Sequence, residues 1–570
     1  MRLKISKSKN STSLYVIKTI YVDGKEYTKT VEKLGTVADL EKKLKGQDPI
    51  EWAKQYVAEL NEKEKEATLD VVVKYSPIKK INKDEQNSYN AGYLFLQQIY
   101  HDLKLRKICN EISRNYKFGF YLNSILSRLI YGRIIYPSSK LATYQLSKNF
   151  IEQPNFDLHQ IYRALEIIAK ETDYIQSSLY NNSLKISKRN TGILYYDCTN
   201  YFFEIEQEDG LKKYGVSKEH RPNPIVQMGL FMDGDGIPLA FSINKGNTNE
   251  QVTLTPLEEQ ILSDFNVSKF VVCTDAGLAS TDNRKFNNIG GRAFITTQSV
   301  KKLKKHLKKW ALDTNDWHLS DKNKVYDISN LDEEKYKDKI FYKERWIKED
   351  GLEQKLIVTY SIKYKNYQRL IRNNQIERAK KVINTNPTKL KKCNSNDYKR
   401  FITKTHCTSE GEIAEKELLS IDTNLIVEEE VFDGFYAVCT NLEDDASRIA
   451  EINRRRWEIE ECFRIMKSEF KARPVYLSRD DRIIAHFTTC FISLIIYRLL
   501  EKRLGEKYTC HEIVKCLKNM NLYEVKGEGY VPTYTRTDLT DDLHEIFGFH
   551  TDYQITKIKD MKKILKLTKK

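Results

Sequence analysis

The sequence predicts an α/β protein in which a mixed sheet is flanked by helices. Three observations support this fold class. Residues 90–187 carry apolar side chains at helical spacing, and residues 192–299 contain successive runs of β-branched and aromatic residues. Beyond them the chain alternates strand-like and helix-like runs. Strands in succession, followed by strand–helix alternation, are typical of a mixed sheet with helices packed on it.

Residues 1–85 predict a small β-hairpin module and a linker. Residues 12–35 alternate apolar and polar side chains around Asp23-Gly24, a dipeptide typical of hairpin turns. Residues 51–68 have the pattern of a charged helix.

Residues 86–190 predict a helical region. Pro137 ends one helical pattern, and Ser138 or Ser139 can cap the helix that follows it. The stretches LHQIYRALEIIAKE and DYIQSSLYNNSLKI then resemble an antiparallel helix pair.

Residues 191–299 predict the first part of the sheet. GILYYDCTNYFFEI, KFVVCTDAGLAS and RAFITTQS read as strands. IVQMGLFMDGDGIPLAFSI reads as a hairpin that turns at residues 233–236.

Residues 300–430 interrupt this pattern. They begin with the basic stretch VKKLKKHLKKW, whose lysines either face DNA or are merely solvated, and continue as short strands and polar loops. We interpret them as a β-rich inserted domain.

Residues 431–505 predict the second part of the sheet domain. GFYAVCTN is a strand, and a helix is expected from about 444 to 470. The apolar run at 486–500 is too short and too polar to span a bilayer, so we expect a core helix with His486 as a buried histidine. Residues 506–570 form a mixed C-terminal region.

Composition narrows the class of partner only partly. Lys and Arg number 95 against 79 Asp and Glu, a formal net charge of +16. This excess favours nucleic acid first and an anionic membrane second, but AT-rich coding would also enrich lysine. The ten cysteines include no C-x-x-C pair, which argues against a disulfide framework or a zinc module. Because the N-terminus lacks an apolar signal segment, we expect a cytoplasmic protein.

Two aspartates lie where strands are expected. Asp197 follows the apolar run ILYY, and Asp275 follows FVVCT. A rigidly held carboxylate suits a divalent cation such as Mg²⁺, which takes oxygen ligands. The alternative for each is an ordinary turn cap.

The stretch RRRWEIEECFRIMKSEF (454–470) predicts a helix with two different faces. Arg456 and Lys467 would lie only about 20° apart around it, and Glu460 about 40° from Arg456. A separate apolar stripe comprises Ile459, Phe463, Met466 and Phe470. The alternative for the charged face is a solvated surface with an Arg–Glu pair worth a few tenths of a kcal/mol.

A family resemblance favours a functional role for these charged residues over a solvated surface. Asn453, Arg456, Glu460 and Lys467 have the spacing of the Y-x2-R-x3-E-x6-K signature. The chain resembles the DDE transposases of insertion-sequence family four, which include the Tn-five type, and especially their long subgroup with an insertion domain. Further blocks agree in the same order: RIIYPSSKLATYQL, YYDCTNYFFE, GVSKEHRPNPIVQMGLFMDGDGIPLAFSINKGNTNE, TDAGLAS, FDGFYAVCTN and KARPVY.

The resemblance implies an RNase H-like catalytic core and a metal-dependent DNA transposase. Asp197 would lie on the first strand, Asp275 after the fourth, and Glu460 on a late helix. The separation of 460 − 275 = 185 residues fits the insertion expected over 300–430. The three carboxylates would hold two Mg²⁺ or Mn²⁺ ions about 4 Å apart. Cleavage of the element ends, followed by joining to target DNA, would give cut-and-paste transposition.

The resemblance also implies DNA contacts. Arg456 and Lys467 would hold phosphates, and Asn453 puts an amide where the signature has a phenol. Lys218 and Arg221 either contact DNA phosphates or lie on a surface loop. Trp457 either stacks on a displaced base or packs in the core.

The implied partner is double-stranded DNA, namely the terminal inverted repeats of the element and the target. The 86–190 helices would recognise the ends. A homodimer would pair the two ends, and the protein would be cytoplasmic and nucleoid-associated, with no membrane partner. Two alternatives stay open: an RNase H-fold nuclease, such as a resolvase, that cuts without joining, and a catalytically silent DNA-binding protein descended from a transposase. Whether excision uses a hairpin is also open.

Overall fold

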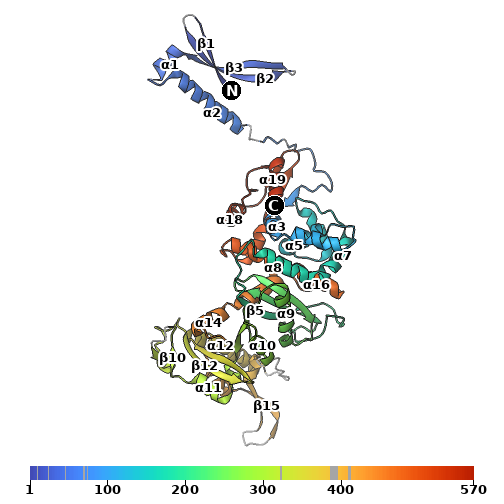
Figure 1. Cartoon of the computed structure of the whole chain (residues 1–570), viewed down its shortest axis with the longest axis vertical. Coiled ribbons are helices and arrows are strands. Elements are labelled where there is room, and N and C mark those ends of the chain that lie inside the picture. The colour runs from blue at the N-terminus through green and yellow to red at the C-terminus, as the bar shows by residue number, and fades with distance from the viewer. Residues whose placement is uncertain are drawn as a thin grey trace. The chain divides into compact units, whose positions relative to one another are not determined.

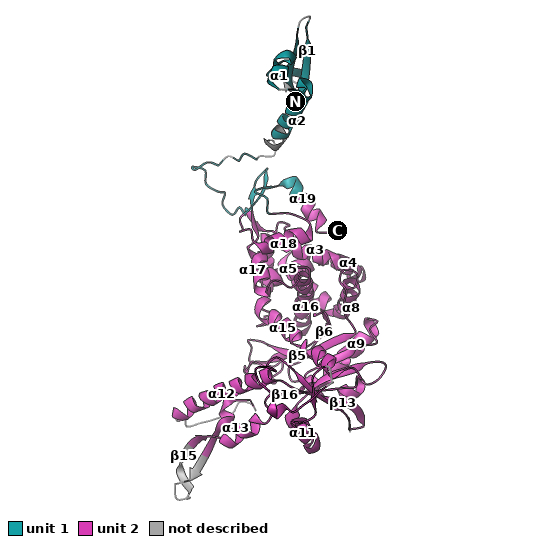
Figure 2. Cartoon of the chain, turned by 90° about the vertical axis from the view of Figure 1, so that its left-hand side faces the viewer, with its two compact units in different colours: residues 1–87, 523–532, 552–561 teal, residues 88–522, 533–551, 562–570 magenta. Residues whose placement is uncertain are grey.

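The structure is a computed structural model that describes residues 1–8, 11–22, 25–44, 46–67, 71–73, 75–320, 324–385, 396–407 and 413–570. The chain divides into two compact units (Figure 2). Unit 1 comprises residues 1–87, 523–532 and 552–561. Unit 2 comprises residues 88–522, 533–551 and 562–570.

The N-terminal part of unit 1 is a sheet packed on helices. Its described elements are β1 (Arg2–Lys7), β2 (Thr12–Val22), β3 (Lys25–Thr36), α1 (Val37–Lys43) and α2 (Pro49–Ala67). The antiparallel order β1-β2-β3 confirms the hairpin predicted over 12–35 and adds β1, which the sequence does not predict. The expected turn Asp23-Gly24 lies outside the described residues. The unit also contains β18 (Gly529–Pro532) and β19 (Thr556–Lys557), which pair antiparallel.

Unit 2 contains the helices predicted over 90–187. After β4 (Ser88–Asn90) come α3 (Tyr93–Asp102), α4 (Leu105–Asn115), α5 (Leu122–Ile135), α6 (Lys140–Leu146), α7 (Leu158–Lys170) and α8 (Thr172–Ser183). As predicted, α5 ends just before Pro137, and the Ser139 hydroxyl caps α6 by accepting a hydrogen bond from the Ala142 N–H at 3.2 Å.

A mixed sheet forms the centre of unit 2, as the sequence predicts. Over the described residues its order is β11-β10-β12-β13-β16-β9-β8-β5-β6-β7. The β5–β8 and β8–β9 pairs are parallel, and the other neighbours are antiparallel. The strands are β5 (Ile193–Phe202), β6 (Ile225–Asp233), β7 (Pro238–Lys245), β8 (Val271–Thr274), β9 (Ala293–Gln298), β10 (Trp317–His318), β11 (Val325–Tyr326), β12 (Phe341–Glu349), β13 (Leu352–Tyr360) and β16 (Phe435–Thr440).

Helices cover both faces of the sheet. Figure 1 shows β5 between α14 (Ala446–Arg454) and α9 (Leu254–Asp264). Tyr195 of β5 donates to the Ile452 carbonyl of α14 at 2.9 Å, whereas the next residue, Tyr196, bonds Thr253 at the start of α9. Odd-numbered side chains of β5 therefore face α14, as the alternation of a strand requires.

The segment predicted as a β-rich insertion extends this sheet. β10 to β13 lie beyond β16, where their pairing covers its edge. The rest of the segment has its own small core, and its elements are α11 (Lys305–Leu312), α12 (Ile362–Asn384), β14 (Ile402–Cys407), β15 (Ile413–Ile421) and α13 (Thr423–Glu430). Arg372 of α12 makes a buried two-point ion pair with Asp433, at 2.7 and 2.5 Å.

The remaining described helices and strands are α10 (Thr281–Phe286), α15 (Trp457–Arg464), α16 (Asp480–Arg503), α17 (Cys510–Asn519), β17 (Asn521–Val525), α18 (Asp538–Phe547) and α19 (Ile558–Leu567). Short 3₁₀ turns cover Ser147–Asn149, Glu250–Val252, Val300–Lys302, Ile328–Asn330 and Tyr398–Phe401.

The single helix predicted over about 444–470 is wrong. The chain forms α14, a joint at Arg455 and Arg456, then α15, and finally a π-helical turn, Ile465–Glu469. The predicted apolar stripe is nevertheless buried throughout. The angles expected around one regular helix do not apply across the joint or the wider turn.

The core helix predicted at 486–500 is confirmed but longer than expected. Of the described helices, α16 alone is long and apolar enough to cross a membrane, with a mean hydropathy of 1.8 in its most apolar stretch. The expectation that it is too short is therefore wrong. However, 94% of that stretch is buried inside the protein, which is typical of a core helix.

Candidate active site

Asp197 lies on β5, and Asp275 directly follows the neighbouring parallel strand β8. Tyr195 of β5 pairs with Cys273 of β8, so the same register continued by two residues places Asp197 level with Asp275. Parallel strands lie about 4.8 Å apart, and side chains two residues apart share a face. The structure therefore brings two of the predicted carboxylates together on the face that α14 covers.

The two aspartates have different surroundings. Burial raises the pKa of Asp197 to about 6, Lys218 and Arg456 oppose this shift, and the nearby Asp275 carboxylate adds to it. Asp275 is held by its own turn, because its Oδ1 accepts the N–H groups of Gly277 and Leu278 at 3.0 and 3.1 Å. The turn-cap alternative is thus true of Asp275, and it fixes the carboxylate beside Asp197.

Lys467 points at the same strand from the π-helical turn. Its Nζ donates to Thr199 Oγ1 at 2.7 Å and lies 3.5 Å from the Glu219 carboxylate. Burial and the neighbouring Lys218 lower the pKa of Lys467 to about 8, while Asp197 opposes this shift. The sequence-predicted cation therefore lies two residues along β5 from the first aspartate.

Lys218 supplies a second cation to this face. Its Nζ donates to the Cys198 carbonyl at 2.6 Å and pairs with Glu250 at 3.0 Å. Burial alone would lower its pKa, but the Asp197 and Glu250 carboxylates raise the pKa of Lys218 above its ordinary value. Arg221, from the same loop, lies over the Phe202 ring at 4.1 Å.

Arg456 and Glu460 are placed by the joint before α15. Arg456 is the residue that precedes α15, and its charge acts on Asp197 and Cys273. Glu460 is exposed and makes no hydrogen bond or ion pair with any described residue. Across the described chain, no three His, Cys, Asp or Glu side chains lie close enough together to hold a metal ion. The structure thus does not bring Glu460 to the aspartates.

Asn453 lies inside the fold. It is 6% exposed, and its amide nitrogen donates to the Tyr436 hydroxyl at 3.0 Å. That hydroxyl also bonds Thr297 at 2.7 Å. As placed here, Asn453 secures α14 to the sheet, and a DNA contact by this residue stays a prediction.

Trp457 does not pack in the core, so that alternative is wrong. Its side chain is 57% exposed at the start of α15. It lines a cavity of about 570 Å³ together with Arg498, His511 and other polar side chains. A stacking role for Trp457 stays a prediction.

The comparison with protein-family models identifies the class of this protein. A family model described as a transposase DDE domain matches residues 202–496, more than half of the chain. The chain belongs to this family. Among curated proteins, none matches the chain.

One solved structure is similar to this transposase over most of its length. It is the cryo-EM structure of the piggyBac transposase synaptic complex with hairpin DNA, with a TM-score of 0.36 and 7% sequence identity. The likeness covers 82% of this chain and 86% of that chain. A TM-score this low supports no conclusion about fold or function.

The family match contains Asp275 and Glu460 but begins five residues after Asp197. In this transposase, Asp197 and Asp275 offer carboxylate oxygens, which are the ligands that a hard divalent cation prefers. The raised pKa of Asp197 also favours a cation at this position. A nearby positive charge would stabilise the ionised form of a buried carboxylate that lies beside a second carboxylate.

Sequence reasoning missed several polar residues of this face. Glu219 contacts both Lys467 and Arg473. It could have been found because it lies in SKEHRPNP between Lys218 and Arg221, the two candidate residues of that segment. Thr199 lies two residues after Asp197, and Arg473 belongs to the KARPVY block. Tyr436 and its partner on β9 could not be found, because they meet only through strand pairing.

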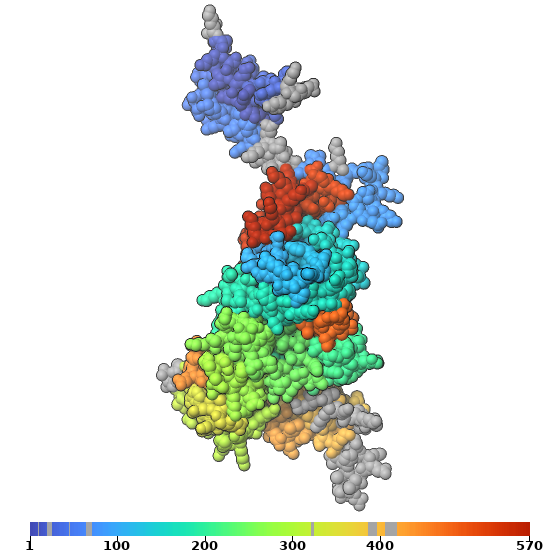
Figure 3. Space-filling model, turned by 45° about the vertical axis from the view of Figure 1, so that its right-hand side comes forward, coloured from blue at the N-terminus to red at the C-terminus, as the bar shows by residue number. Residues whose placement is uncertain are grey.

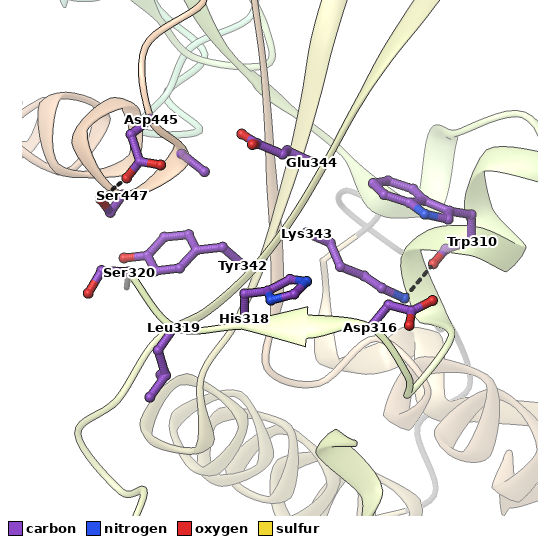
Figure 4. Close-up of a pocket in the computed structure, with 11 residues that line it drawn as sticks. Trp310, Asp316, His318, Leu319, Ser320, Tyr342, Lys343, Glu344, Asp445 and Ser447 are labelled. Atoms are coloured by element: carbon purple, nitrogen blue, oxygen red, sulfur yellow. Dashed lines mark hydrogen bonds between the residues drawn. The ribbon is translucent and has the colours of Figure 1, made fainter. Parts of the chain in front are cut away.

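Another cavity of the transposase, of about 270 Å³, lies between β10, β12 and α14 (Figure 4). Its lysine, Lys343, is already satisfied by the carbonyls of Asp313 and Trp310, at 3.0 and 3.4 Å. His486 is likewise the buried histidine that the sequence predicts, with its Nε2 3.1 Å from the Ala472 carbonyl oxygen.

Proposed function

We propose that this protein is the transposase of a bacterial-type insertion sequence resembling family four, and that it cleaves the ends of its element and joins them to target DNA by cut-and-paste transposition. The observation that carries the proposal is the adjacency of Asp197, on β5, and Asp275, directly after the parallel strand β8. It gains force because the chain belongs to the transposase DDE domain family.

Strand order supports an RNase H-like core. If β5 to β9 are numbered one to five, their order in the sheet is 3-2-1-4-5, with strands one to three antiparallel and strands one, four and five parallel. Asp197 then lies on strand one, and Asp275 directly follows strand four. These positions support the roles that we propose for both carboxylates.

The catalytic carboxylates are Asp197, Asp275 and Glu460. Together they would hold two Mg²⁺ or Mn²⁺ ions, and the chemistry that such ions would supply is activation of water or a 3′-hydroxyl and stabilisation of the leaving oxygen. Glu460 has no competing partner among the described residues, so its side chain is available to the aspartates. Asp275 is held by its turn and Asp197 by its strand, which positions two carboxylates before DNA binds.

The cations near these carboxylates would hold the DNA backbone. Lys467 is aimed at β5 by Thr199, and Lys218 and Arg456 act on Asp197 from other elements. A partly buried cation attracts phosphate more strongly than it would in open water, because the local dielectric constant is lower. Arg221 and Trp457 would contact the strand further from the reacting phosphate.

The wider context of the reaction follows from the same proposal. The helices of residues 86–190 would recognise the inverted repeats, and two copies of the chain would pair two ends. The protein would act in the cytoplasm on nucleoid DNA.

The test uses the purified full chain, the repeats that border its reading frame, a target plasmid, and Mg²⁺ or Mn²⁺. We expect end cleavage and joining, and we expect both to be lost with EDTA and in Asp197→Asn, Asp275→Asn and Glu460→Gln. Glu461→Gln is the matched control, because it makes the same change on α15 at a residue that pairs with Arg464. Cleavage that survives in any of the three variants refutes the catalytic assignment.

The same assay separates the alternatives. Cleavage without joining by the unaltered protein would identify a nuclease, and DNA binding without cleavage would identify a silent descendant of a transposase.

A further inference from the structure

A cavity of about 460 Å³ lies between the helical region and the segment that follows the π-helical turn. We call it the Lys140 pocket. It is lined from α5, α6 and α7 on one side and from residues 471–486 on the other. Four cationic side chains contribute to it: Arg133, Lys140, Lys471 and Arg473. None of the described residues that line it is acidic.

Two of these cations are buried without a carboxylate. Arg133 is 4% exposed and donates to the carbonyls of Phe470 and Ser138, at 3.0 and 3.2 Å, while its Nε has no partner. Lys140 is 5% exposed, and no described residue accepts a hydrogen bond from its Nζ or pairs with it. Buried charges in folded proteins are normally paired, so this arrangement is costly unless an anion enters from outside.

The pocket adjoins the candidate active site. Arg473 contacts Glu219, and Glu219 pairs with Lys467, which is bonded to Thr199 on β5. A short chain of polar contacts therefore joins the pocket to the strand that carries Asp197. Figure 3 shows late residues of unit 2, in orange, at the surface between the teal helical region and the green strands.

Two further lining residues, Tyr476 and His486, indicate the class of anion that the pocket would bind. Tyr476 lines the pocket and is 69% exposed, so an aromatic face lies near the buried cations. Cations that hold the backbone, together with aromatic rings, are the usual features of a surface that holds a nucleic-acid strand. His486 adds no charge, because burial and the nearby Arg133 and Lys140 keep its pKa well below the usual range.

We propose that the Lys140 pocket binds a phosphate group of the DNA strand that passes the candidate active site. The identity of the strand rests on the proposed function, whereas phosphate binding by the pocket does not. The block RIIYPSSKLATYQL would then provide a phosphate contact near the catalytic residues.

The first test measures inorganic phosphate binding by the full chain. Lys140→Met removes the charge at similar volume, and Lys185→Met is the matched control because Lys185 is an exposed lysine of the same region. At constant ionic strength, exchanging chloride for phosphate should raise Tm more in the unaltered protein and in Lys185→Met than in Lys140→Met, because site binding adds to the general stabilisation by phosphate that all three proteins share. Equal phosphate effects in all three proteins overturn the proposal.

The second test measures duplex DNA binding without divalent metal. We expect Lys140→Met to bind DNA several-fold more weakly, with a salt dependence reduced by about one phosphate contact. Lys140→Arg should recover most of the affinity, and Lys515→Met, at an exposed lysine of α17 outside the helices proposed to recognise the ends, should match the unaltered protein. A loss of the phosphate effect with unchanged DNA affinity would mean a site for free phosphate only, which overturns the DNA assignment.

The two proposals can fail separately. Neither binding test needs catalysis, and Asp197→Asn should keep both the phosphate effect and its dependence on Lys140. If the unaltered protein neither cleaves nor joins DNA, the proposed function fails while the pocket result stands. If cleavage occurs but Lys140→Met binds phosphate and DNA like the unaltered protein, the pocket proposal fails alone.

Discussion

Replacing Lys140 with methionine is expected to stabilise the metal-free protein, and more so at neutral than at alkaline pH. Burial and the nearby Arg133 lower the pKa of Lys140 from 10.5 to about 7. The folded state therefore disfavours the protonated amine. The penalty is complete below about pH 7 and is relieved as the pH rises toward the unfolded value of about 10.4.

The magnitude follows from the pKa difference. Between about pH 7 and pH 9 the unfolded chain keeps this proton and the folded protein releases it, so the free energy of unfolding rises with pH. Each pH unit contributes at most about 1.4 kcal/mol, so the advantage of Lys140→Met should shrink by about 2 kcal/mol over this interval.

The surrounding groups do not produce the same signal. The other charged or titratable side chains around Lys140 are Arg133 on α5, Tyr162 on α7, His486 and Cys490 on α16, and Lys471 and Arg473 after the π-helical turn. Burial raises the pKa of Cys490 and lowers that of His486, so both stay uncharged over this interval.

The assay is denaturant unfolding at the two pH values in buffers free of phosphate, with Lys185→Met as the control. A stability difference between the unaltered protein and Lys140→Met that does not change with pH would refute the buried-charge argument. So would a variant that is less stable at neutral pH.

Three further outcomes are expected. Lys467→Ala should reduce the rate of end cleavage by roughly 100-fold at a temperature where the variant is still folded, because one cation near the reacting phosphate is lost, and an unaltered rate would count against this role. Asn453→Tyr, which restores the signature residue, should lower the free energy of unfolding by about 1–3 kcal/mol, because the ring must enter the space beside Tyr436; denaturant unfolding with no loss would contradict the packing. Arg372→Met should cost about 3 kcal/mol in the same assay, because Asp433 stays buried without its cation, and a neutral effect would show that this pair is dispensable.

The positions of the two aspartates at strands could be predicted because the local sequence determines where these strands form. An uninterrupted apolar run both forms a buried strand and marks its end, and Asp197 and Asp275 lie on or directly after such runs. Parallel pairing then makes them neighbours. The extension of the sheet by β12 and β13 could not be predicted in this way, because the partner strand β16 lies about 80 residues further along the chain.

The joint and the π-helical turn could not be predicted from the local sequence. No proline or glycine interrupts residues 444–470, and the apolar stripe continues across the π-helical turn. The irregularities come from backbone bonds that periodicity does not reveal. Arg455 N–H and Arg456 N–H donate to carbonyls only three residues earlier, and Phe470 N–H donates to Ile465 five residues earlier. Glu460 and Lys467 therefore do not share the single helical face that their spacing predicts.

The composition of unit 1 has a consequence for protein synthesis. The N–H of Glu524 donates to the Asn87 carbonyl at 2.7 Å, and Lys526 pairs with Glu85, so early and late segments of the chain share one unit. At roughly 5–20 residues per second, a ribosome needs about 20–90 s to travel from one segment to the other. A copy whose reading frame is broken after residue 505 would keep Asp197, Asp275 and Glu460 but never complete this unit. Decay of the gene from its 3′ end would therefore spare the three proposed catalytic residues and remove part of the fold first.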